Sequence, residues 1–364
     1  MSRILISLII ALHSLNLISQ TTDSKMYVLG HSLLDYRPDT SYSDEYTVPH
    51  WLHMLAQADG NTYAGGGKYG FLPQHYIFND WFAQWGYDVV PPSWDSDNES
   101  FAEADLTTLV FTAANFIQNS QAPDEDYFGQ PGISPLSCAK AIVDSSIIAE
   151  PSIKVYIYEN WPEMNNFTGN NFPPTEAQFQ AYNNYTQTTF HDWWITYQDS
   201  LLLSNPLDSV KMIPVGPILG RLFADTILQN VPYDSLYVDG DPHGTPSLYL
   251  LAAMTTYMAV YQDQCPTSIS LPFTIHSDIR NNYTLINDYI WGELQNYTDG
   301  NGISRVFFGG QGNTPTISVA AKLENGAFYI DDDNGLILKG RDGNCYLIYV
   351  NLNGQLVHET TPCP

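Results

Sequence analysis

A serine near the start of the chain has the surroundings of a catalytic nucleophile. Ser32 lies in Gly30-His31-Ser32-Leu33, directly after the apolar run Lys25–Leu29, which predicts a buried strand. Open α/β sheets bind their ligands at the carboxyl ends of such strands. The backbone N–H of Ser32 and the start of the next helix can also face a developing oxyanion there. Ser32 is therefore a candidate nucleophile for acyl transfer, although a serine in this position also commonly caps a helix.

Two other segments could supply the hydrogen-bond donors that acyl transfer needs. A second strand is expected from Asn61–Ala64 and is predicted to end at Gly65-Gly66-Gly67, where a backbone N–H can approach a substrate. Asn160 follows the predicted strand Lys154–Tyr158, and its amide can donate to the same oxyanion. Gly66, within the triplet, and Asn160 are therefore candidate oxyanion donors. Alternatively, the glycines form only a turn, and Asn160 holds a loop in place.

The segment Val238-Asp239-Gly240-Asp241-Pro242-His243 contains a candidate base and its acid. An imidazole beside carboxylates suits general-base catalysis, because a carboxylate orients the ring and stabilises its cation. The segment precedes a predicted helix over Ser247–Gln262, so His243 stands near a helix start. Asp239 and Asp241 are both candidates for the acid. Asp239 is favoured slightly, since Asp241 is so close to His243 in sequence that its side chain is expected to point away.

The order of these segments resembles the sequence blocks of the SGNH (GDSL-type) hydrolase superfamily, which run GDS(L), Gly, Asn and DxxH. The resemblance covers about residues 25–298. It implies a three-layer α/β/α fold with a five-stranded parallel sheet. It also implies ester hydrolysis by Ser32 and His243, with the oxyanion bound by the Ser32 N–H, a glycine N–H of the triplet and Asn160. That reaction needs no cofactor and no metal.

The chain departs from the family pattern at two positions. His31 stands where the family usually has an Asp that supports the nucleophile. Gly240 stands three residues before His243, where the family has its acid, so Asp239 and Asp241 remain the two candidates. The second departure also supports a function of another class, a glycan-binding protein on a catalytically decayed scaffold.

The rest of the first 300 residues alternates apolar runs with longer stretches of helical period. Further strands are predicted at Leu106–Thr112 and Val210–Val215, and helices at Pro49–Ala58 and Glu176–Asp199. Strands separated by segments of helix length indicate βαβ units, and hence a parallel sheet with helices on both faces. The predicted fold class is therefore α/β, over a domain spanning residues 21–300.

Residues 301–364 are predicted to form a small antiparallel β module. Glycine and asparagine become dense, and Asn-Gly pairs at 334–335 and 353–354 favour hairpin turns. The expected strands are Ala327–Ile330, Leu336–Lys339, Tyr346–Val350 and Gln355–His358. This module loosely resembles the secretion-sorting domains of exported bacterial enzymes. A carbohydrate-binding accessory module is the rival interpretation.

The charge balance limits the partners of the protein. Among 364 residues, 39 Asp and Glu oppose 13 Lys and Arg, a net charge of −26. A chain this acidic is not expected to bind nucleic acid, whose phosphates need basic patches, or an anionic membrane surface. Aromatic residues make up 13% of the chain, a share that suits a carbohydrate or apolar cleft as well as a core.

Residues 1–20 have the features of a cleaved signal peptide, with Arg3 ahead of an apolar run that is short for a membrane span. The sequence therefore predicts a secreted, periplasmic or cell-surface protein. Export permits disulfides, and four cysteines allow three pairings. Cys345 with Cys363, and Cys138 with Cys265, are the pairs proposed here. With export, the composition favours a small-molecule or polysaccharide ester as substrate, acetylated carbohydrate ahead of lipid.

Overall fold

The computed structural model describes most of the chain. The described residues are 22–37, 45–83, 89–113, 122–127, 129–169, 171–204, 210–224, 227–300 and 302–308, together with the backbone of short strands after residue 321. The signal peptide predicted for residues 1–20 lies outside them. The chain divides into two compact units, one of Met1–Leu294 with Arg305–Gly309 and one of Gln295–Ser304 with Gly310–Pro364.

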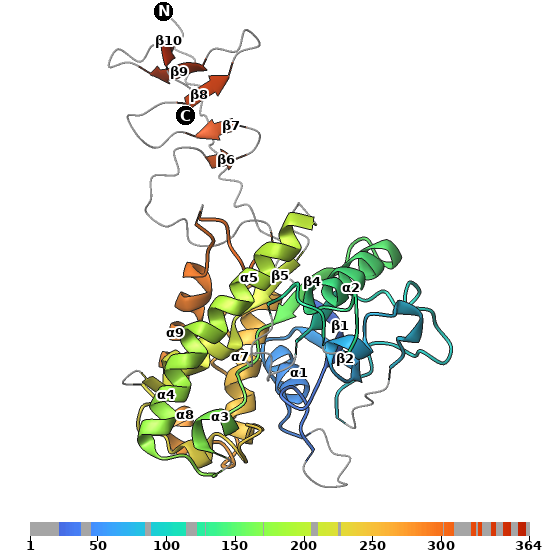
Figure 1. The fold of residues 1–364 in the computed structure, drawn as a ribbon. Helices are drawn as coiled ribbons and strands as arrows, with labels where there is room; N and C mark the ends of the chain where they lie inside the picture. The colour runs from blue at the N-terminus through green and yellow to red at the C-terminus, as the bar shows by residue number, and fades with distance from the viewer. Residues whose placement is uncertain are drawn as a thin grey trace, which may run out of the picture. The chain divides into compact units, whose positions relative to one another are not determined.

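A five-stranded, all-parallel sheet forms the centre of the first unit (Figure 1). Its strands are β1 (Asp23–Gly30), β2 (Thr62–Tyr69), β3 (Thr108–Phe111), β4 (Lys154–Tyr158) and β5 (Val210–Ile213). They lie in the order β2-β1-β3-β4-β5. All residues of β3 and β5 are buried, as expected for strands covered by helices on both faces. The predicted α/β class with a five-stranded parallel sheet is confirmed.

Helices follow the strands and flank the sheet (Figure 1). They are α1 (Val48–Ala58), α2 (Pro135–Ala149), α3 (Asn165–Thr168), α4 (Glu176–Gln187), α5 (Thr189–Ser204), α6 (Val215–Ala224), α7 (Pro246–Tyr261), α8 (Ser277–Asn281) and α9 (Tyr283–Asn296), with single 3₁₀ turns at Leu72–Gln74, Phe78–Asp80 and Tyr233–Ser235. Helix α7 packs against α1 and is buried on all sides, because it is apolar around its whole circumference. It begins at Pro246, whose fixed φ favours a first helical turn. This rigid helix start lies three residues after His243.

The glycine triplet lies inside strand β2, not at its end. The strand continues to Tyr69, and Gly66 stands opposite Tyr27 in the ladder with β1. A Cβ on Gly66 would lie 2.9 Å from Ser93 Oγ, and Ser93 itself donates a hydrogen bond to the Met26 carbonyl. The glycine therefore makes room for a neighbouring segment to pack on the sheet. The expectation that the strand ends at the triplet is wrong, so the reason for predicting Gly66 as an oxyanion donor does not hold.

The long helix predicted over Glu176–Asp199 is two helices. Helix α4 ends at Gln187 and α5 begins at Thr189, because Thr188 between them has φ −118° and ψ −101°, outside the helical region. The Thr188 hydroxyl donates to the Asn184 carbonyl at 2.7 Å and so satisfies an acceptor at the end of α4. Helix α4 packs mainly against α6, whereas α5 packs against α2 and β5.

The proposed disulfide between Cys138 and Cys265 does not form. Both are buried free thiols in different surroundings. Cys138 lies in α2, where burial raises its pKa to about 11. Cys265 follows α7, and its backbone N–H donates to Asn287 Oδ1 at 3.0 Å. Cys363 lies outside the described residues, so its pairing with Cys345 stays a prediction.

The second unit contains short antiparallel strands, as the sequence predicts. Strands β6 (Lys322–Glu324) and β7 (Ala327–Tyr329) form one pair, and β8 (Leu336–Lys339), β9 (Cys345–Val350) and β10 (Leu356–Thr361) form a sheet in the order β10-β9-β8. The Asn-Gly pairs expected to form hairpin turns lie outside the described residues. The division into units differs from the predicted boundary at residue 300, because Arg305 returns to the first unit, where its carbonyl accepts from the Met212 N–H at 2.8 Å.

Candidate active site

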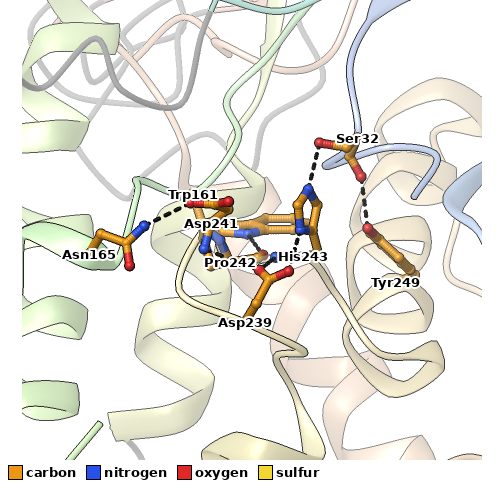
Figure 2. A network of polar contacts seen from close by, with 8 residues as sticks. All are labelled: Ser32, Trp161, Asn165, Asp239, Asp241, Pro242, His243 and Tyr249. Atoms are coloured by element: carbon orange, nitrogen blue, oxygen red, sulfur yellow. Dashed lines mark hydrogen bonds and ion pairs between the residues drawn. The ribbon is translucent and has the colours of Figure 1, made fainter. Parts of the chain in front are cut away.

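Ser32 lies in a tight turn at the carboxyl end of β1. The turn is closed by the Leu34 N–H, which donates to the His31 carbonyl at 2.9 Å. A Cβ on Gly30 would lie 2.6 Å from Leu34 Cδ1, so a larger residue at that position would displace the Leu34 side chain. Tyr249, in the first turn of α7, donates its hydroxyl to the Ser32 carbonyl at 2.8 Å (Figure 2). Backbone and helix together hold the Ser32 hydroxyl at the ligand-binding edge of the sheet.

Ser32, His243 and Asp239 form a continuous relay of hydrogen bonds (Figure 2). Ser32 Oγ lies 2.9 Å from His243 Nε2, and His243 Nδ1 lies 2.7 Å from Asp239 Oδ2. With Asp239 ionised, Nδ1 carries the hydrogen and Nε2 is left to accept from the serine hydroxyl. The structure thus brings together the nucleophile, the base and one of the acids expected from the sequence. Such a relay can draw a proton from Ser32 during attack on a carbonyl carbon.

Asp239, and not Asp241, contacts the imidazole. The second carboxylate oxygen of Asp239 accepts from the backbone N–H groups of Asp241 and His243, both at 3.1 Å. One side chain therefore closes the turn and holds the ring. Asp241 instead accepts a hydrogen bond from Asn165 Nδ2 at 2.7 Å (Figure 2). The orientation expected for Asp241 from its short distance to His243 in sequence is the one observed.

The glycine at position 240 has a steric cause. A Cβ on Gly240 would lie 2.1 Å from Asn165 Oδ1, and the Gly240 carbonyl accepts from the Met164 N–H at 3.1 Å. The segment that follows β4 packs so closely here that an aspartate at 240 would displace Asn165. The acid of the relay stands one residue earlier, at Asp239, and the Asx-type turn brings its carboxylate back to His243.

The segment after β4 also fixes the backbone beside the base. Trp161 Nε1 donates to the Pro242 carbonyl at 2.8 Å (Figure 2), and the Trp161 side chain is fully buried. The Trp161 carbonyl in turn accepts from Asn160 Nδ2 at 2.8 Å. Residues 160–165 therefore connect the candidate oxyanion donor to the loop that carries Asp239 and His243.

Asn160 is fully buried at the same sheet edge as Ser32. Its Oδ1 accepts from the Thr112 hydroxyl at 2.8 Å, which sets the orientation of the amide. Thr112 follows β3, the strand that lies between those preceding Ser32 and Asn160. The amide nitrogen carries a second hydrogen beyond the one given to Trp161. Asn160 thus follows β4 as the sequence predicts, and its amide is held by Thr112 and Trp161.

Gly70, and not the triplet, stands at the end of β2. Its N–H donates to the Gly30 carbonyl at 2.9 Å, which extends the ladder between β1 and β2. This hydrogen bond occupies the backbone donor at that strand end. The candidate oxyanion donors that stand at the sheet edge are thus the Ser32 N–H and the Asn160 amide.

His31 supports the turn instead of taking part in the relay. It is buried, its Nδ1 accepts from the Leu33 N–H at 3.4 Å, and its Nε2 lies 3.3 Å from the Ala113 carbonyl. Burial lowers the pKa of His31 to about 4, so the ring is neutral at pH 7. His31 is therefore a neutral side chain that bridges the end of β1 and the segment after β3.

A second acid–imidazole pair lies beside Asn160. Glu159 is fully buried, and its Oε1 lies 2.7 Å from His191 Nδ1. Burial raises the pKa of the Glu159 carboxyl. Burial acts to lower the pKa of His191, but the adjacent Glu159 carboxylate raises it above the ordinary value. The pair anchors α5 to the end of β4.

Comparisons with known proteins find little likeness. No family model matches the chain, and no curated protein matches it. A solved structure from Streptococcus pneumonia, provisionally described as a platelet activating factor, has 14% identity and a TM-score of 0.35, covering 68% of this chain and 88% of that chain. That likeness is too distant to inform function.

Several residues of the site carry no signal in the sequence. Tyr36 stacks on the His243 ring, Tyr249 holds the Ser32 carbonyl, and Asn165 binds Asp241. Each is an ordinary polar or aromatic residue at an ordinary spacing, so only the folded chain brings it to the site. Among the described residues, no group of three or more histidine, cysteine, aspartate or glutamate side chains is placed to hold a metal ion. In the same part of the chain, no helix has both the length and the apolar character needed to cross a membrane.

Proposed function

We propose that the protein is a serine ester hydrolase that acts through Ser32, His243 and Asp239. The observation that carries this proposal is the relay, with 2.9 Å between Ser32 Oγ and His243 Nε2 and 2.7 Å between His243 Nδ1 and Asp239 Oδ2. The alternative, a decayed scaffold that binds glycans, rests on the absence of an aspartate at 240. The contact between Asp239 and His243 supports hydrolysis over this alternative.

The reaction begins when Ser32 Oγ attacks the ester carbonyl carbon and its proton passes to His243 Nε2. The carbonyl electron pair moves onto oxygen, where the Ser32 N–H and the Asn160 amide donate hydrogen bonds. Collapse of this intermediate breaks the bond to the alcohol oxygen, which takes the proton from His243. Water then attacks the acyl-enzyme and gives its proton to His243, which returns it to Ser32 as the carboxylic acid leaves.

The proposed substrate is an extracellular ester, with acetylated carbohydrate ahead of lipid. Export is supported by the apolar run after Arg3, and a carbohydrate by the aromatic content of 13%. The net charge of −26 argues against polyanionic substrates and against nucleic acid as a partner. Acetate release from a panel of acetylated polysaccharides, compared with release of fatty acid from lipid esters, separates the two classes.

Ser32→Ala tests the mechanism directly. Wild type is expected to hydrolyse p-nitrophenyl acetate, and the variant to lose this activity while keeping its circular dichroism and melting temperature. The small side chain of Ser32 is at a turn, so its replacement by alanine removes the nucleophile without disturbing the core. Turnover by Ser32→Ala close to that of wild type would exclude Ser32 as the nucleophile.

A further inference from the structure

The aromatic ring of Tyr36 lies flat against the imidazole of His243. The ring centroids are 3.6 Å apart and the two planes differ by 9°. A stack of this kind uses the face of the imidazole and leaves its edges available. Nε2 keeps its contact with Ser32 and Nδ1 its contact with Asp239. Tyr36 therefore restrains the ring in the one direction that these two hydrogen bonds leave open.

The residues on either side of Tyr36 hold its backbone in place. Asp35 is buried, and its carboxylate accepts from Arg37 Nε at 2.9 Å and from Arg37 Nη2 at 2.7 Å. A paired contact of this type fixes the geometry of both side chains. One residue earlier, the Leu34 carbonyl accepts from the Val48 N–H at the start of α1, at 3.1 Å. The position of Tyr36 over His243 is thus built by the turn that carries Ser32.

We propose that Tyr36 is a positioning residue for His243, which keeps the imidazole plane aligned and stabilises the cation formed when Ser32 gives up its proton. This inference rests on the proposed ester hydrolysis. As the Ser32 proton moves to Nε2, positive charge spreads over the imidazole against the electron-rich face of the phenol ring. The Asp239 carboxylate faces the same ring at its Nδ1 edge, while His31 close by is neutral because burial lowers its pKa to about 4.

A cation–π contact predicts a pattern of effects that a substrate-binding wall does not. Proton transfer to His243 occurs in acylation and in deacylation, so losing the stack lowers kcat. A residue that only contacts the substrate would change KM instead. Phenylalanine keeps the aromatic face, whereas leucine keeps apolar cover of similar size without π electrons. Tyr36→Phe and Tyr36→Leu therefore separate the aromatic contribution from simple packing.

The matched control is Tyr185→Leu. Tyr185 lies on α4, half-buried, with its ring beside Phe167 and Phe190. It belongs neither to the relay nor to the loop around it. Replacing it removes a tyrosine of similar exposure. Any change in kcat or labelling rate in this variant therefore reports the loss of a half-buried tyrosine in itself.

The experiment measures two reactions and one spectrum on the full chain. The second-order rate of Ser32 labelling by a fluorophosphonate, and kcat for p-nitrophenyl acetate, are expected to fall about tenfold in Tyr36→Leu with KM within twofold. Tyr36→Phe and Tyr185→Leu are expected to stay within twofold of wild type. In proton NMR spectra, the Cε1–H of His243 is expected to lie upfield in wild type and Tyr36→Phe, because of the stacked ring, and to move downfield in Tyr36→Leu.

Four results would overturn the inference. Labelling of Ser32 at the wild-type rate in Tyr36→Leu would show that the stack does not assist proton transfer. A rise in KM alone would make Tyr36 a substrate contact, and an unshifted His243 resonance in wild type would exclude the stack itself. If wild-type Ser32 does not react at all, the proposed hydrolysis fails, and the role of Tyr36 that depends on it fails too.

Discussion

At the scale of single residues, the Asp239 side chain both closes its own turn and contacts the imidazole of His243. Its carboxylate accepts from two backbone N–H groups and from the imidazole, whereas Asp241 binds Asn165. Asp239→Asn keeps an oxygen for the turn but can present its amide hydrogen to Nδ1, which favours the wrong tautomer of His243. We expect kcat to fall on the order of 10³-fold with little change in KM.

Asp241→Asn is the matched control for that prediction, because it changes the same charge two residues away. Its turnover of p-nitrophenyl acetate should stay within about threefold of wild type. A larger loss in Asp241→Asn than in Asp239→Asn would mean that the loop rearranges when substrate binds. Wild-type rates in both single variants and in the double variant would leave a backbone carbonyl as the group that orients His243.

The buried amide of Asn160 is the second residue whose role can be isolated. Asn160→Ala is expected to lower kcat by 10²–10³-fold, the usual loss for one oxyanion donor, with KM nearly unchanged. Thr112→Val removes the hydroxyl that orients the amide but keeps the amide itself, so its kcat should fall less. Steady-state kinetics on one ester measures both. A change in KM alone for Asn160→Ala would assign the residue to substrate binding.

At the scale of elements, the segment after β4 and the loop before α7 are packed directly against each other. Gly240 and Asn165 are in contact, with 2.1 Å between Asn165 Oδ1 and the position of a Cβ on Gly240. Gly240→Ala should push the Asn165 side chain away from Asp241 and lower the free energy of unfolding by about 1 kcal/mol, the worth of the lost hydrogen bond. Asn165→Ala should lower the free energy of unfolding by a similar amount.

Urea unfolding of the double variant decides whether the two effects share a cause. If Gly240→Ala acts by displacing Asn165, the double variant should be no less stable than Asn165→Ala alone, since the clash is gone. Additive losses would mean instead that alanine at 240 strains the loop backbone. Circular dichroism at 222 nm follows the transition in all variants.

At the scale of the whole molecule, burial of neutral histidines makes stability depend on pH. Burial lowers the pKa values of both His31 and His75 to about 4, from 6.5 for an ordinary imidazole. As the pH falls below 6.5, these two imidazoles therefore bind protons in the unfolded chain but stay neutral in the folded chain. Their contribution to stability is complete above that value and is lost progressively toward pH 4, on the order of 3 kcal/mol for each ring.

His75→Gln tests this dependence without touching the relay. Its unfolding free energy, measured in urea between pH 7.5 and 4.5, should fall less steeply with acid than that of wild type. Carboxylates titrate in both proteins, so the difference between the two slopes reports His75 alone. Parallel curves would show that the His75 ring has the same pKa in the folded and the unfolded chain.

Some features of the fold and the site depend only on residues close together in sequence, and these features could be predicted. Strand and helix signals depend on neighbouring residues, so β1, β4 and α7 were predictable. Ser32, Asn160 and His243 stand at the ends or starts of those elements, where parallel topology gathers them at one edge. The α/β class and the positions of the candidate nucleophile and base therefore follow from local patterns, in their order along the chain.

The tertiary structure decided the features that depend on segments distant in sequence. Asn165 occupies the space beside Gly240 and binds Asp241, 76 positions away, and Asp239 is the carboxylate that contacts His243. Ser93 packs against Gly66 and keeps β2 running through its glycines, contrary to the expected turn. Tyr36 reaches His243 only because two turns meet at the sheet edge. Local residue patterns carry no information on such contacts, since they arise only when distant segments pack together.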